Sequence, residues 1–178
     1  MVRQIKKTKT KTNTYTDGYT LVEMLIYVAI LSIFSITIVS SILSFSQSYR
    51  NLLALRMVDN TAIDAMERMT RDIRSASSVV LASSTLGVSP GVLTLISTAN
   101  GFSTTTKFYI ENSLLKVDVN NTYLGPLSVS GSSVTNLVFT KITSPISSAV
   151  KIDMAVQGTV GSIIKTKTYH DTVILRGQ

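Results

Sequence analysis

Residues 18–49 read GYTLVEMLIYVAILSIFSITIVSSILSFSQSY, and this stretch decides the fold of the N-terminal part of the chain. Glu23 is its one charged residue, and the run 24–49 that follows carries no charge. About 20 apolar residues in a helix cross the hydrocarbon core of a bilayer. The run is therefore long enough to span a membrane, although seven serines and Thr37 make its hydrophobicity moderate.

A basic, threonine-rich segment precedes the apolar run. The chain has a net charge of +7, of which residues 1–18 contribute +4. Basic residues before an apolar span hold that end of the chain in the cytoplasm, so we expect the C-terminal part to lie outside. In an ordinary secretory signal the small-residue cleavage site follows the apolar region. Here the candidate site, Gly18, precedes it, so cleavage there would leave the apolar helix on the mature protein.

Residues 19–77 are predicted to form one long helix, because neither glycine nor proline interrupts them. We expect 19–49 to be the membrane-spanning half and 50–77 an amphipathic half. One face of the second half carries apolar residues at steps of three or four: Leu52, Leu55, Val58, Ala62, Met66, Met69, Ile73 and Ala76. The other face is charged, and the spacing predicts the ion pairs Asp64–Arg68 and Glu67–Arg71.

From residue 78 onward the pattern becomes β-like, and we refer to residues 78–178 as the head. The expected strands are 78–82, 92–97, 107–111, 114–119, 136–143, 149–157 and 165–176, with loops at the Ser/Thr runs 83–85 and 103–106. Asn112-Ser113 is typical of a tight hairpin turn. One long helix followed by strands predicts an α+β fold, with an antiparallel sheet packed on the apolar stripe of the helix.

The segment Gly18-Tyr19-Thr20-Leu21-Val22-Glu23 resembles the cleavage and methylation motif of type IV pilins and of type II secretion and competence pseudopilins. The resemblance implies that a prepilin peptidase cuts between Gly18 and Tyr19 and methylates the new amine of Tyr19. It also implies that Glu23 pairs with the N-terminal amine of an adjacent subunit during assembly. A carboxylate at the edge of an apolar span is costly without such a partner.

Weaker resemblances suggest a minor subunit. Two segments, residues 69–76 (MTRDIRSA) and 168–176 (TYHDTVILR), resemble the corresponding segments of minor J-type pseudopilins and minor pilins. Many major pilins have a proline where this chain has Ser40, and many close a C-terminal loop with a disulfide. The chain has no cysteine, so both departures favour a minor subunit.

Other residues carry less specific signals. His170 lacks a second histidine or a cysteine, so we expect a surface histidine and no metal site. Asp118 and Asp153 are expected to be solvated, and Arg71, Asp72 and Arg74 to form a charged helix face. A basic face of Lys141, Lys151, Lys165 and Lys167 would make nucleic acid a partner, a weakly supported alternative. Asn120-Asn121-Thr122 matches a glycosylation acceptor, a frequent chance match.

The sequence thus predicts a structural subunit of a pilus or pseudopilus, without enzymatic activity or cofactor. Its expected partners are the prepilin peptidase, other pilin or pseudopilin subunits, the inner-membrane assembly platform and, before assembly, the lipid bilayer. We expect a single-pass protein of the cytoplasmic membrane that later joins a surface or periplasmic filament. The alternative is a membrane-anchored extracellular binding module that does not polymerise.

Overall fold

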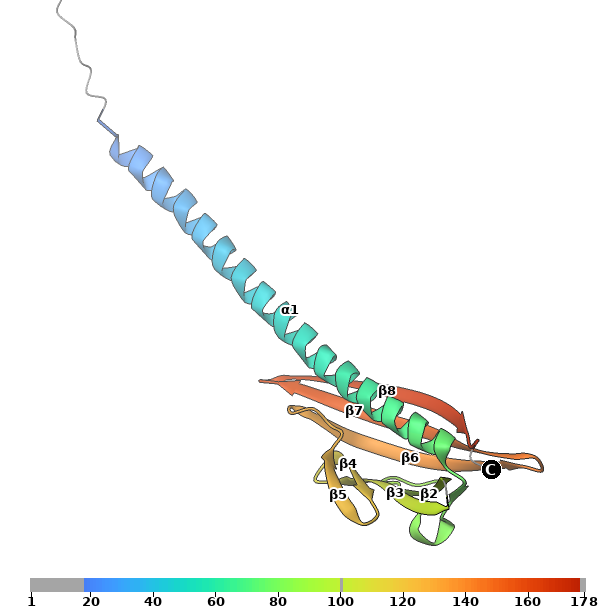
Figure 1. Ribbon diagram of the computed structural model, residues 1–178. Coiled ribbons are helices and arrows are strands. Elements are labelled where there is room, and N and C mark those ends of the chain that lie inside the picture. Colours follow the sequence, from blue (N-terminus) through green and yellow to red (C-terminus); the bar gives the residue numbers. More distant parts are fainter. Residues whose placement is uncertain (1–17, 100, 177–178) are drawn as a thin grey trace, which may run out of the picture. The chain divides into compact units, whose positions relative to one another are not determined.

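The computed structural model describes residues 18–99 and 101–176, and it shows one helix followed by eight strands and a short 3-10 turn (Figure 1). The elements are α1 (Leu21–Ser75), β1 (Ser78–Val79), η1 (Leu81–Ser83), β2 (Leu93–Ala99), β3 (Phe102–Glu111), β4 (Leu114–Val119), β5 (Thr122–Pro126), β6 (Ser132–Ser144), β7 (Ser147–Val160) and β8 (Ile163–Ile174). The expected α+β class is confirmed. Most of the predicted leader, residues 1–17, lies outside the described residues.

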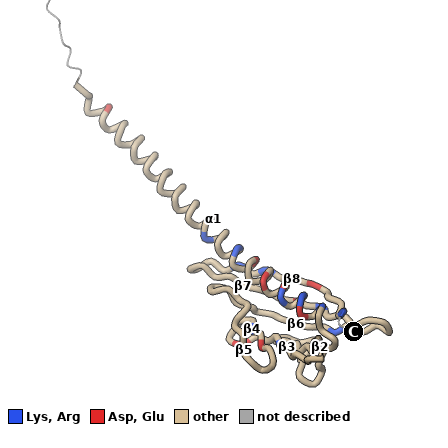
Figure 2. The backbone as a smooth tube through the Cα atoms, in the orientation of Figure 1, with Lys and Arg blue, Asp and Glu red and all other residues tan. Residues whose placement is uncertain are grey.

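The chain divides into two compact units, Met1–Phe45 and Ser46–Gln178. In the first unit, the described part of α1 leaves its large apolar side chains exposed, with Leu21 at 83% and Phe45 at 75%. In Figure 2 a long stretch of α1 carries neither red nor blue, in agreement with the sequence, which has no charged residue between Glu23 and Arg50. A window of α1 has a mean hydropathy of 2.4 and no buried residue, so the helix is long and apolar enough to cross a membrane. Such a surface requires lipid or other apolar chains around it.

The second unit, which we call the globular unit (46–178), contains two antiparallel sheets. Their strand orders are β1-β2-β3-β4-β5 and β6-β7-β8, so strands that follow one another in the chain are neighbours within each sheet. Most strands are longer than expected from the sequence, and β1 is shorter because η1 replaces its second half. The expected loop at 103–106 is wrong, since these residues lie within β3. β5 was not predicted.

The predicted hairpin at Asn112-Ser113 is confirmed. β3 and β4 pair up to Glu111 and Leu114, and both turn residues have positive φ angles, 53° and 61°. Two consecutive residues with positive φ are typical of the turn whose twist matches that of a hairpin. A second pair with the same geometry, Asn120 and Asn121, connects β4 to β5.

The second half of α1 packs its buried stripe into the core of the globular unit. The buried residues of this stripe are Ala54, Val58, Thr61, Ala62, Ala65, Met69 and Ile73. Val58, Ala62, Met69 and Ile73 were predicted correctly, but Leu52 and Leu55 are 56% and 38% exposed. Compared with the predicted stripe, the buried face of α1 is therefore rotated toward the small residues Ala54 and Ala65.

A close approach between α1 and β7 explains this rotation. At Gly158 of β7, an added Cβ would lie 2.5 Å from the carbonyl oxygen of Ala54 and 2.9 Å from Cγ2 of Val58. Backbones that come so close leave room for glycine and alanine but not for leucine. Small side chains on α1 thus set how closely the helix packs on the three-stranded sheet.

Candidate processing and assembly site

Gly18 and Tyr19 lie outside the helix, on the N-terminal side of its first residue, Leu21. Both are exposed, and a Cβ built on Gly18 would meet no atom within 4 Å. The peptide bond between them is therefore in non-helical, uncrowded backbone. A protease requires an extended and accessible segment of this kind, and glycine lets the backbone adopt that conformation at low cost.

Thr20 caps the helix that follows. Its hydroxyl oxygen accepts a hydrogen bond from the Glu23 amide at 3.2 Å, and its carbonyl accepts one from the Met24 amide at 3.2 Å. Threonine at this position satisfies an amide that has no partner within the helix. The sequence Thr20-Leu21-Val22-Glu23 has the spacing of a capping box, which marks the start of the helix.

The Glu23 side chain does not complete that capping box. Its Oε1 accepts a hydrogen bond of 2.9 Å from the hydroxyl of Tyr27, one helical turn later. The Tyr27 ring also packs edge-on against the Tyr19 ring, with centroids 6.2 Å apart and planes at 78°. Glu23 and Tyr27 therefore share one helix face, as their spacing of four requires, and the Tyr19 ring packs against Tyr27 from the segment that precedes the helix. The sequence prediction included Tyr19 and Glu23 but missed Tyr27.

Four of the eight serine and threonine hydroxyl groups within the apolar part of α1 bond to the helix itself. Ser32, Ser35, Thr37 and Ser41 each donate to the carbonyl four residues earlier, at 2.8–2.9 Å. Polar groups in hydrocarbon must find partners within the protein, and this back-bonding supplies them. These three serines and Thr37 are therefore compatible with a lipid environment.

In the globular unit, polar contacts join α1 to β8. The Asp59 carboxylate on α1 accepts hydrogen bonds from Lys167, at 2.9 Å, and from the Tyr169 hydroxyl. These bonds, that of Lys167 first, lower the pKa of Asp59. The pKa of Tyr169 is raised, mainly by burial and then by the bond to Asp59. Farther along, Thr70 donates to Asp171 at 2.9 Å.

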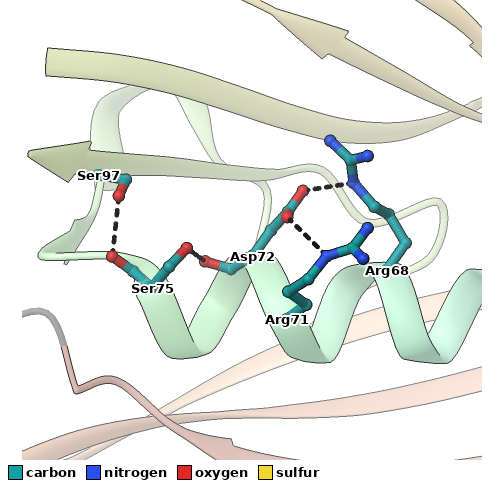
Figure 3. A network of polar contacts seen from close by, with 5 residues as sticks. All are labelled: Arg68, Arg71, Asp72, Ser75 and Ser97. Atoms are coloured by element: carbon teal, nitrogen blue, oxygen red, sulfur yellow. Dashed lines mark hydrogen bonds and ion pairs between the residues drawn. The ribbon is translucent and has the colours of Figure 1, made fainter. Parts of the chain in front are cut away.

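The C-terminal turns of α1 carry the polar network shown in Figure 3. Arg68 pairs with Asp72 at 2.8 Å, and the Arg71 Nε lies 4.0 Å from the same carboxylate. Among the described residues no ion pair joins Asp64 to Arg68 or Glu67 to Arg71, so both predicted pairs are wrong. Arg68 has an aspartate four residues away on either side. It pairs with Asp72, whose side chain is 16% accessible, rather than with the exposed Asp64.

The same network anchors the end of the helix to the sheet. The Ser75 hydroxyl donates to the Asp72 carbonyl at 3.0 Å, and the Ser97 hydroxyl on β2 donates to the Ser75 carbonyl at 2.9 Å (Figure 3). Carbonyls in the last turn of a helix lack partners within it. Ser97 supplies one, which holds the helix terminus on β2.

The remaining candidate residues lie in two different sheets. Asp153 accepts a bond from His170 and pairs with Lys151 at 3.0 Å, and these contacts, that of His170 first, lower the pKa of Asp153. Asp118 lies in the other sheet, where Tyr109 donates to it at 3.1 Å. In the part of the chain that the structure describes, no three His, Cys, Asp or Glu side chains are grouped to hold a metal ion.

The four lysines considered for nucleic-acid binding do not share one face. On β7, Lys151 is paired with Thr172, and Val156 is paired with Lys167. Residues 151 and 156 point to opposite faces of the sheet, because side chains alternate along a strand. Lys151 and Lys167 therefore lie on opposite faces, and each is already paired with an aspartate.

An open groove of about 730 Å³ lies on the globular unit along α1. Its apolar floor includes Ile63 and Met66, and its charged lining includes Glu67, Arg71 and Asp171. The charges are mixed in sign, so the groove does not select an anion or a cation.

The comparison with protein families gives one match. Residues 15–43 match the family model described as the prokaryotic N-terminal methylation motif. The matched segment includes Gly18, Tyr19, Glu23 and Tyr27. A search of curated proteins and a search of solved structures each gave no significant match.

Proposed function

We propose that this chain, which is type IV pilin-like in its methylation motif and its long apolar N-terminal helix, is a subunit of a type IV pilus or of a type II secretion or competence pseudopilus. The motif indicates processing by prepilin peptidase and assembly with other pilin subunits, and hence a structural subunit rather than an enzyme. The match to the methylation motif is the observation that carries the proposal.

The first step is removal of residues 1–18 between Gly18 and Tyr19. Two observations support this site: both residues are exposed, and neither belongs to α1. The peptidase then methylates the new amine of Tyr19. The basic leader lies on the cytoplasmic side of the membrane, and the head lies outside.

Assembly then moves the apolar part of α1 from lipid into a filament. Its exposed apolar side chains, from Leu21 to Phe45, contact lipid tails in the membrane and apolar side chains of other subunits in the filament. Glu23 pairs with the Tyr19 amine of the adjacent subunit, so that each charge compensates the desolvation of the other. The inner-membrane assembly platform supplies the subunits, and the filament extends to the periplasm or the cell surface.

The finer role that we propose is that of a minor subunit. α1 continues without interruption through Ser40, where many major pilins have a proline. The head is held by its apolar core and by polar contacts to α1, since the chain has no cysteine to form a disulfide. These features distinguish the chain from the major-pilin pattern.

Intact-mass analysis tests the proposal against the alternative of a membrane-anchored binding module that does not polymerise. The chain is expressed with and without prepilin peptidase. Loss of residues 1–18 and gain of one methyl group only when the peptidase is present would support the subunit. A chain that keeps its leader beside an active peptidase would contradict it.

A further inference from the structure

We propose that the Tyr27 hydroxyl is the partner of the Glu23 carboxylate in the unassembled subunit and is replaced by the Tyr19 amine of a neighbour on assembly. This inference rests on the proposed function. Tyr27 thus acts on assembly through Glu23, whose carboxylate it holds until a neighbouring subunit replaces it. The two side chains together are called the Tyr27–Glu23 clasp below.

Two contacts of Tyr27 build the clasp, one with Glu23 on the same helix face and one with Tyr19 just before the helix. Tyr27 donates to Oε1 of Glu23 at 2.9 Å, and its ring packs edge-on against that of Tyr19. The ring contact fixes the direction of the tyrosine side chain, and aromatic rings prefer this edge-on arrangement. The hydroxyl is thereby held where the carboxylate can accept from it.

The need for such a partner follows from the surroundings of Glu23. Between Glu23 and Arg50 the helix has no charged residue, so no basic side chain within the span can neutralise the carboxylate. The Glu23 backbone amide is bonded to Thr20, which leaves the side chain free to pair elsewhere. A carboxylate in an apolar setting without a donor is costly. The phenol hydroxyl lowers that cost without adding a charge.

A neutral donor also suits a contact that must later break. The hydrogen bond from Tyr27 already gains from the charge on the carboxylate, but its donor is neutral. A terminal ammonium brings a full opposite charge, whose attraction to the carboxylate is strong in a low-dielectric setting. The ammonium of a neighbouring subunit would therefore displace the phenol. The clasp keeps Glu23 satisfied in the membrane and still favours the transfer to the filament.

The contact is tested by ¹³C NMR of the processed chain in lipid bicelles, with labelled Glu side-chain carboxyl and Tyr ζ carbons. We expect Tyr27→Phe to shift the Glu23 carboxyl signal and Glu23→Ala to shift the Tyr27 ζ signal. Tyr49→Phe, which removes a hydroxyl farther along α1, should leave Glu23 unchanged. Unchanged signals in both reciprocal variants would overturn the clasp.

The transfer is tested by the ratio of processed subunit in sheared filaments to that in the membrane. Tyr27→Phe keeps the ring but removes the contact that assembly must break, so we expect this ratio to rise roughly three- to tenfold. In a Glu23→Ala background the same change should have no effect. A Tyr27→Phe ratio equal to wild type, or an effect that persists without Glu23, would overturn the transfer. A wild-type chain that keeps its leader would overturn the proposed function as well, so the two failures are distinguishable.

Discussion

The Tyr169 hydroxyl on β8 donates a hydrogen bond to the Asp59 carboxylate on α1. This contact joins the last strand of the chain to the helix, across a long separation in sequence. Lys167, two residues before Tyr169 on the same strand, bonds the same carboxylate at 2.9 Å. A single aspartate thus holds two side chains of β8, which has a strand on only one side within the described part of the chain.

Tyr169→Phe is expected to lower the free energy of unfolding of the globular unit by about 1–2 kcal/mol, because a hydrogen bond to a charged group is lost. Because the pKa of Tyr169 is raised in the folded chain, the free energy of unfolding should also depend on pH. In the unfolded chain tyrosine ionises near pH 10, so stability should fall as the pH rises above about 10. Thermal unfolding in detergent micelles at increasing pH measures both effects.

Tyr123→Phe is the matched control for this prediction. Tyr123 lies on β5 and is 49% exposed. Its hydroxyl should contribute little to the free energy of unfolding. Equal stability of Tyr169→Phe and wild type at neutral pH would show that the contact with Asp59 does not hold β8 in solution.

The contacts of Asp59 should make the free energy of unfolding depend on pH in the acid range. Its pKa is lowered in the folded chain by the bonds from Lys167 and Tyr169. The stabilisation is therefore present above the pKa of an unfolded aspartate, about 3.9, and is lost as the pH falls through the folded value. Asp59→Asn should make unfolding less dependent on pH below about pH 4. Asp64 is an exposed acid on the same helix, so Asp64→Asn should keep the wild-type dependence of stability on pH. A wild-type pH dependence in Asp59→Asn would show that the contacts of Asp59 do not stabilise the fold.

Sequence reasoning succeeded where periodicity and composition act locally. The uncharged run after Glu23 and the absence of glycine and proline predicted α1 to within two residues at each end. The turn at Asn112-Ser113 was found because its residues favour positive φ. The class α+β followed from the order of these elements.

The errors arise where the packing and placement of individual side chains, which residue spacing alone leaves open, decide the outcome. Leu52 and Leu55 fit an apolar stripe, but the approach of Gly158 favours the smaller Ala54 at the interface. Arg68 pairs with Asp72 rather than Asp64, although both are four residues away. The role of Tyr27 was missed because a tyrosine in an apolar helix carries no signal of its own until its hydroxyl is placed on Glu23.

Gly158→Ala is expected to destabilise the globular unit by about 1–3 kcal/mol, the usual cost of overpacking a core. The new methyl group would meet the Ala54 carbonyl oxygen at 2.5 Å, and backbone cannot move aside as a flexible side chain can. Thr159→Ala changes the next, exposed residue and should have a small effect. Chemical denaturation followed by circular dichroism checks this, and equal midpoints for Gly158→Ala and wild type would disprove the close packing.

Gly18→Ala is expected to slow removal of the leader at least severalfold and to leave the longer precursor in the membrane. Because a Cβ at this position meets no atom of the chain, the change should not disturb the fold. Any loss of processing would then reflect the fit of the chain to the peptidase. Immunoblotting of precursor and mature forms over time measures the rate, and processing at the wild-type rate would show that Gly18 is not recognised.

Glu23→Ala is expected to leave processing largely intact and to reduce incorporation into filaments roughly tenfold or more, since a hydrogen-bonded charge pair between subunits is lost. Glu23→Gln serves as the matched variant: its amide oxygen can still accept from Tyr27, but it has no charge to attract a terminal amine. If the charge is what assembly requires, both variants should be processed and both should remain in the membrane. Quantifying the processed chain in sheared filaments and in membranes decides the point. Normal incorporation of Glu23→Gln would show that a hydrogen bond at this position suffices and that the ammonium pairing is wrong.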